Sequence, residues 1–133
     1  MQKTPYGWAA LIALVALTVL LAGFSAFVGW HKTTAPLALL RENSAWTIHL
    51  PVALGRIVGV LELAAVAALA IALLVPRAAR LGLLGAAWIG ANHVVAAVFH
   101  IIHKEWHTLT QSGIVIALCL VWVTLWYNRS RHA

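Results

Sequence analysis

Long apolar runs alternate with short polar segments along the whole chain. Four runs of roughly 20 residues, at about 8–30, 51–75, 81–103 and 109–127, have the length that a helix needs to cross the hydrocarbon core of a bilayer. Because lipid offers the backbone no hydrogen-bond partner, a spanning segment is a helix or a strand of a closed barrel, and these runs are too long and continuous for barrel strands. The pattern therefore predicts an all-α fold, a four-transmembrane-helix bundle that forms one domain over residues 1–133.

The composition agrees with a membrane protein. Hydrophobic residues make up 63% of the chain and charged residues only 9%. A soluble domain of this size cannot bury so much apolar surface, since its exposed surface is already largely apolar. The formal net charge is +6, but the basic residues lie near the ends of the apolar runs. This distribution indicates membrane orientation and not nucleic-acid binding, so the expected partner is the lipid bilayer.

The same basic residues predict the orientation. An even number of spans places both termini on one side, which carries five basic residues against three on the other side. Because loops rich in Lys and Arg stay in the cytoplasm, we expect both termini to be cytoplasmic, in an integral protein of a bacterial inner membrane. The five are Lys3, Arg77, Arg80, Arg129 and Arg131, and the three are Lys32, Arg41 and Lys104. The outer side then holds His31, His49, His103 and His107, and the inner side holds His132.

Two smaller features lie at the ends of the predicted spans. The loop at 31–50 contains a candidate amphipathic helix, Pro36–Ala45. Aromatic residues near the span ends fit the belts that anchor helices at the membrane interface. They are Trp8, Trp30, Trp46, Trp106, Trp126 and Tyr127.

Glu62 is the unusual residue of the second span, because it interrupts the otherwise apolar run Ile57–Val75. A charged side chain at the centre of a transmembrane helix costs roughly 2.5–3.5 kcal/mol, so it normally has a partner or a function. Counting from the outer ends of the second and third spans, at 1.5 Å per residue, places Glu62 and His93 at about the same depth. The two residues are therefore candidates for an acid–base pair.

Small residues suggest how the second and third spans pack. The second contains a GxxxG element, Gly55 to Gly59, and one face of the third carries Gly82, Ala86 and Gly90. Small residues at such spacing let two transmembrane helices approach closely. We therefore expect these two spans to pack together, with Glu62 and His93 facing each other or a shared cavity.

The resulting hypothesis is a Glu/His pocket within the membrane that opens to the outer side. Arg56 and His100 lie one to two turns nearer the outer surface, and His100 shares a helix face with His93. Such a pocket can relay protons, bind a polar head group or supply an acid and a base. The alternative is an interhelical hydrogen bond or ion pair that only fixes packing. The candidate catalytic residues are Glu62 and His93, and the candidate ligand-binding residues are Lys32, Arg56, Asn92 and His100.

A metal or haem is a further alternative, since carboxylate and imidazole are suitable ligands. No tight ligand motif such as HExxH lies within one predicted helix. The candidate metal ligands are Glu62, His93, His100, His103 and His107.

Four short motifs in order resemble those of the DoxX-like superfamily of small four-helix membrane proteins. They are Gly29-Trp30-His31-Lys32, Gly59-Val60-Leu61-Glu62-Leu63, Pro76, and the small-residue run Ala96-Ala97-Val98-Phe99-His100. The resemblance implies a four-helix bundle with Lys32, Glu62 and His100 on a common interior. It also implies a link to redox chemistry with quinone, because the superfamily takes its name from a membrane subunit associated with thiosulfate oxidation. His93, His103 and His107 have no place in these motifs.

Three functions follow as hypotheses. The first is a redox-associated protein that binds a quinone-like or other small lipophilic ligand, with Glu62 and His93 handling its protons. The second is a small membrane enzyme, such as an isomerase, that uses Glu62 and His93 as acid and base on a lipophilic substrate. The third is a structural or assembly subunit. The bundle is expected to act alone, as a homo-oligomer or within a larger membrane complex.

Overall fold

The computed structural model describes residues 5–131, and over this range every regular element is a helix. Two residues of the orientation argument, Lys3 and His132, lie outside the described range. Four long helices are each apolar and long enough to cross a membrane, so the predicted all-α transmembrane fold is confirmed. They are α1 (Pro5–Thr34), α3 (Val52–Leu74), α4 (Ala79–Ile102) and α5 (Leu109–Arg131).

Short helical elements connect the spans. Helix α2 (Leu37–Glu42) and the 3-10 turn η1 (Trp46–His49) join α1 to α3. The predicted amphipathic segment Pro36–Ala45 is therefore a shorter helix, and its Leu40 side chain is buried. The turns η2 (Pro76–Ala78) and η3 (Trp106–Thr108) connect the remaining spans.

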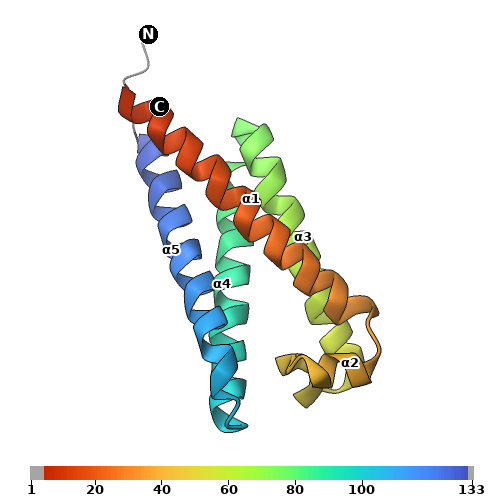
Figure 1. Cartoon of the computed structure of the whole chain (residues 1–133). Coiled ribbons are helices and arrows are strands. Elements are labelled where there is room, and N and C mark those ends of the chain that lie inside the picture. Colours follow the sequence, from red (N-terminus) through yellow and green to blue (C-terminus); the bar gives the residue numbers. More distant parts are fainter. Residues whose placement is uncertain (1–4, 132–133) are drawn as a thin grey trace.

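The four long helices pack in chain order, and α1 also contacts α5. Both termini lie at one end of the bundle and α2 lies at the other (Figure 1). Helices α1 and α5 are close together at the terminal end and diverge towards the α2 end (Figure 1).

An apolar core closes the terminal half of the bundle. It gathers around Trp122 of α5, which is fully buried between side chains of α1, α3 and α4 such as Leu14, Leu69 and Ile89. The indole N–H of Trp122 donates a hydrogen bond of 2.8 Å to the hydroxyl oxygen of Thr18. The terminal half thus has the packing of a stable core, whereas buried polar residues gather towards the α2 end.

Glycines set the spacing of the helices, although not entirely as predicted. Helices α3 and α4 do pack together, and a Cβ built at Gly85 would lie 2.7 Å from the backbone oxygen of Ala65. The GxxxG element, however, does not face α4. A Cβ built at Gly59 would lie 2.8 Å from the backbone oxygen of Gly29 in α1, and Gly55 faces Thr47 of η1. The small-residue pattern predicted a close helix contact but not the partner helix, because a face of small residues can pack against any neighbouring helix.

The prediction of interfacial aromatic residues is also wrong at two positions. Trp8, Trp30, Trp106 and Tyr127 are exposed, as a belt requires. Trp46 and Trp126 are buried instead. Trp126 stacks on Trp122 with ring centroids 4.9 Å apart, and Trp46 lies in the wall of the pocket described below.

Candidate functional site

An ion pair between Lys32 and Glu62 lies inside the bundle. Lys32 is in the last turns of α1, and its Nζ donates a hydrogen bond of 2.7 Å to Oε2 of Glu62 in α3. The two side chains are only 5% and 0% exposed. The close approach of Gly29 and Gly59 brings the backbones of α1 and α3 near enough for this contact. The charge on Glu62 is thus neutralised by Lys32.

Arg56 holds the end of α1. Its guanidinium donates to the backbone oxygens of Lys32, at 2.7 Å, and Ala35, at 2.6 Å. These carbonyls lie at the C-terminal end of α1, where no following helical turn supplies N–H donors to them. Arg56 therefore fixes the backbone that carries Lys32.

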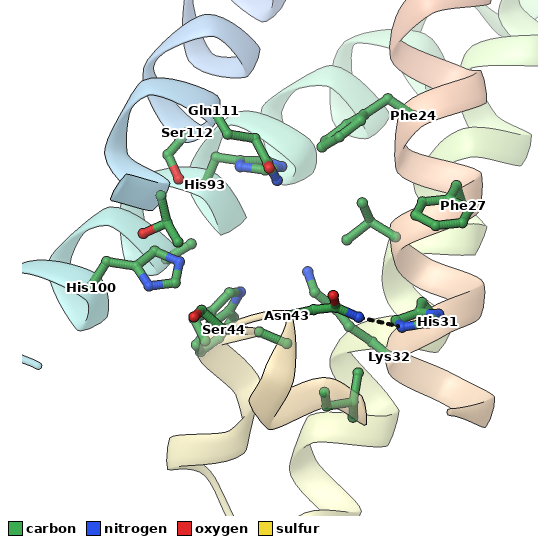
Figure 2. A pocket seen from close by; sticks show the side chains of 16 residues that line it. Phe24, Phe27, His31, Lys32, Asn43, Ser44, His93, His100, Gln111 and Ser112 are labelled. Atoms are coloured by element: carbon green, nitrogen blue, oxygen red, sulfur yellow. Dashed lines mark hydrogen bonds between the residues drawn. The ribbon is translucent and has the colours of Figure 1, made fainter. Parts of the chain in front are cut away.

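A pocket of about 300 Å³ lies between α1, α4 and α5 at the α2 end of the bundle. Figure 2 shows aromatic side chains on the α1 side and polar side chains on the α4 and α5 side. Residues of α2, η1 and the segment between them close it from below. The lining side chains include Phe24, Phe27, His31, Lys32, Leu40, Asn43, Ser44, Trp46, His93, His100, Gln111 and Ser112.

His93 is a buried polar group in the wall of this pocket. Its side chain is only 3% exposed, and both Nδ1 and Nε2 have no hydrogen-bond partner among the described residues. The ring lies 6.0 Å from the ring of Phe24, centroid to centroid. His100, two turns further along α4, lines the same pocket, which agrees with the predicted common face.

Glu62 and His93 do not form the pair that depth alone suggested. No hydrogen bond joins them in the described structure, and Glu62 is absent from the pocket wall. Lys32 connects the two regions, because it lines the pocket and also binds Glu62. Of the other candidate ligand-binding residues, Arg56 and Asn92 do not line this pocket, and Asn92 is buried with its Nδ2 unpaired in the described range.

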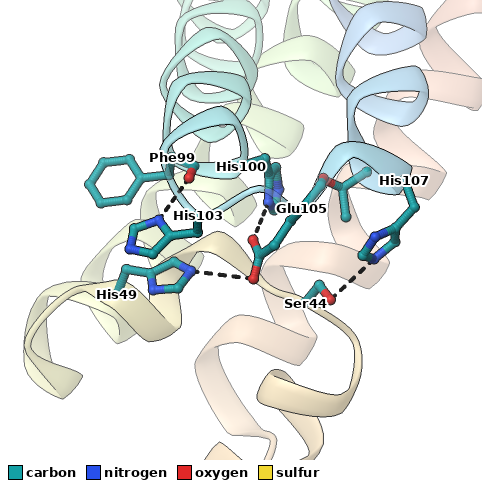
Figure 3. A network of polar contacts seen from close by, with 8 residues as sticks. Ser44, His49, Phe99, His100, His103, Glu105 and His107 are labelled. Atoms are coloured by element: carbon teal, nitrogen blue, oxygen red, sulfur yellow. Dashed lines mark hydrogen bonds and ion pairs between the residues drawn. The ribbon is translucent and has the colours of Figure 1, made fainter.

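Glu105, in the turn between α4 and η3, joins two histidines (Figure 3). Oε2 of Glu105 lies 2.7 Å from Nδ1 of His100, and Oε1 lies 3.5 Å from Nε2 of His49. The His49 ring stacks on His103 with centroids 3.4 Å apart. Burial opposes ionisation of Glu105, but the hydrogen bond to His100 and the charge of His49 outweigh it and lower the pKa of this carboxyl.

The DoxX-like family model matches residues 16–123, most of the chain. The chain belongs to the DoxX-like family. Comparison with curated proteins and with solved structures gave no match. The protein is therefore an integral membrane protein of this family, with its apolar helices in a lipid bilayer.

The interior of this DoxX-like protein contains the three residues that the resemblance placed there, since Lys32, Glu62 and His100 are all buried. The candidate metal ligands do not gather. Within residues 5–131, no group of three or more His, Cys, Asp or Glu side chains could hold a metal ion. His103 donates from Nδ1 to the backbone oxygen of Phe99, and His107 contacts Ser44.

Sequence reasoning missed Glu105 and much of the pocket wall, including Phe24, Phe27 and Trp46. Trp46 lines the pocket, although its position near a span end suggested an interfacial anchor. Glu105 was not a candidate site residue, because it lies between two predicted spans. The scarcity of acidic residues could have pointed to Glu105, because the chain has only three acidic residues but seven histidines.

Proposed function

We propose that this DoxX-like protein binds a small lipophilic molecule with a polar ring head, of the quinone class, in the pocket between α1, α4 and α5. The observation that carries the proposal is His93, a buried side chain in the pocket wall whose two ring nitrogens have no hydrogen-bond partner within residues 5–131. A buried polar group without a hydrogen bond costs about 1–3 kcal/mol. A ligand that bonds to the ring recovers that free energy.

The chemistry of the wall fits such a head group. A neutral imidazole offers one N–H donor and one acceptor nitrogen. The indole N–H of Trp46 is a second buried donor with no partner among the described residues. The volume of about 300 Å³ is near the lower end of small-molecule sites, which favours a single ring over a larger cofactor. Phe24 and Phe27 supply aromatic surface to cover the ring.

The mouth of the pocket supports entry from the bilayer. Phe27 of α1 is 67% exposed although it lines the pocket, and Gln111 on the facing helix α5 is exposed as well (Figure 2). Phe27 lies within the span of α1, so its outer surface faces lipid. A lipophilic ligand can therefore reach the pocket without first entering water.

The Lys32–Glu62 pair supports a structural role for Glu62 beside this binding function. A carboxylate already neutralised by an ammonium at 2.7 Å is a poor candidate for the base of the enzymatic alternative. Proton handling by His93 fits the geometry better, because His93 lines the pocket and neither ring nitrogen has a hydrogen-bond partner among the described residues. Location in a bacterial inner membrane with cytoplasmic termini, and association with further copies or a larger complex, remain predictions from the sequence.

Calorimetric titration of the detergent-solubilised protein with a short-tailed benzoquinone tests the proposal. His93→Leu should weaken binding at least about tenfold, since one hydrogen bond to the head is lost. His107→Leu is the matched control, because His107 is exposed and outside the pocket wall. The proposal fails if the wild type does not bind the probe, or if His93→Leu binds it as tightly as the wild type does.

A further inference from the structure

The contact between His100 and Glu105 determines which nitrogen of His100 carries the proton. Nδ1 of His100 lies 2.7 Å from Oε2 of Glu105, so one hydrogen lies between them. Glu105 is outside the apolar spans, and its lowered pKa keeps it a carboxylate at neutral pH. An ionised carboxylate only accepts hydrogen bonds. The hydrogen therefore belongs to Nδ1 of His100.

The position of that hydrogen fixes the character of Nε2. In a neutral imidazole one nitrogen is a donor and the other an acceptor. With Nδ1–H directed at Glu105, Nε2 of His100 is an acceptor. No described residue forms a hydrogen bond with this nitrogen, and the His100 ring lines the pocket (Figure 2). A ligand in the pocket therefore meets an acceptor at His100.

The carboxylate is held in place by more than one contact. His49 of η1 approaches the second oxygen of Glu105 at 3.5 Å, and His103 stacks on His49 (Figure 3). Glu105 is 20% exposed, whereas the His100 side chain is only 6% exposed. The other titratable residues in the pocket wall are His31, Lys32 and His93. Because two elements hold the carboxylate, its orientation towards His100 is set by the fold.

We infer that Glu105 is a positioning residue that presents Nε2 of His100 as an acceptor, so that the pocket selects a ring head with a hydroxyl donor, such as a phenol or hydroquinone. The inference rests on the proposed function and narrows its ligand class. A head group with only carbonyl or ether oxygens, the benzoquinone included, can still accept a hydrogen bond from His93 or Trp46, but it places two acceptors against each other at His100 and should bind more weakly than a head with a hydroxyl donor. Such a pair is repulsive, and unpaired buried polar groups are what sites use to reject an analogue.

A matched pair of redox-inert probes tests this selection. We would titrate 4-hexylphenol and its methyl ether, 4-hexylanisole, at pH 8. The wild type should bind the phenol at least about tenfold more tightly than the ether, as expected when a polar site loses one hydrogen bond. Glu105→Met removes the acceptor that holds Nδ1–H, and the preference should fall to about threefold or less.

Two further variants separate positioning from a general effect on the fold. In Glu105→Gln the amide oxygen can still accept from Nδ1–H, so most of the preference should be retained. Glu42→Met is the matched control, since Glu42 is an exposed glutamate in α2 outside the pocket wall. It should leave the preference unchanged. Full preference for the phenol in a folded Glu105→Met protein would overturn the inference.

Nitrogen-15 NMR of labelled histidines reads the tautomer without any ligand. The His100 signal should show the proton on Nδ1 in the wild type and should change in Glu105→Met. A proton on Nε2 in the wild type overturns the inference even if both probes bind. If neither probe nor the benzoquinone binds, the proposed function fails, and the proposed ligand selection fails with it, whatever the tautomer. The two failures are therefore distinguishable.

Discussion

Replacing Glu62 by glutamine leaves the buried ammonium of Lys32 without its counter-charge. The two charged atoms are 2.7 Å apart in side chains only 5% and 0% exposed. At an effective dielectric constant of about 20, two unit charges at this distance attract by about 6 kcal/mol, and dehydration of both ions offsets much of this attraction. Removing one partner of such a pair typically destabilises a protein by about 3–5 kcal/mol. We expect Glu62→Gln and Lys32→Met each to show a loss of this size.

The double variant is the informative member of the cycle. Lys32→Met with Glu62→Gln removes both charges, so no uncompensated ion remains, and the loss should be smaller than in either single variant. Unfolding titrations in mixed micelles, followed by helix signal, give the free energy of each protein. The reasoning is refuted if both single variants stay within about 1 kcal/mol of the wild type, or if the double variant loses the sum of the two single losses.

Three more predictions follow from the packing and the network. Gly59→Ala should destabilise the bundle by about 1–3 kcal/mol, since the new Cβ would lie 2.8 Å from the Gly29 backbone oxygen and α1 must move away; unchanged stability in the same unfolding titration would contradict the contact. Trp122→Phe should cost at least about 1 kcal/mol, because the hydrogen bond to Thr18 is lost inside the core, and a Thr18→Val background should remove most of that bond's share of the effect. The pKa of Glu105 is lowered in the folded protein, so the ionised carboxylate stabilises the fold at pH 7. This stabilisation is lost as the pH falls below the ordinary glutamate pKa of about 4.3 and through the lower pKa of the folded state. The stability difference between the wild type and Glu105→Gln should therefore shrink on acidification, and a difference that grows would show the opposite sign of the shift.

The spans could be predicted from the sequence because hydrophobic length alone determines what crosses a bilayer. Lys32 shows where this approach stops. The apolar run ends at Trp30, so the predicted span stopped before Lys32, but α1 continues to Thr34 and Lys32 in its last turns is buried and bound to Glu62 of α3. A helix can therefore continue past the end of an apolar run when its next polar residue has a partner inside the protein.

Which residues the buried polar groups contact depends on how α1 packs across the other helices, and no local sequence pattern specifies this packing. Depth counting placed Glu62 and His93 at about the same level of the bundle, and both side chains are buried. It could not determine which helix each residue faces. Gly59 faces α1, so Glu62, three residues later and almost one turn along, binds Lys32 instead of His93. His93 faces the space where α1 and α5 diverge, and this divergence is a property of the whole bundle (Figure 1).

The location of a bound ligand tests the central proposal most directly. A short-tailed benzoquinone carrying a photoreactive diazirine would be cross-linked to the protein in bilayer nanodiscs, and the modified peptides would be identified by mass spectrometry. We predict modification concentrated at α4 around His93 and at α1 around Phe27, suppressed by an excess of the parent benzoquinone. Modification spread over lipid-facing positions such as Ile12, Val19 and Leu120, without suppression by the parent compound, would contradict the pocket as the binding site.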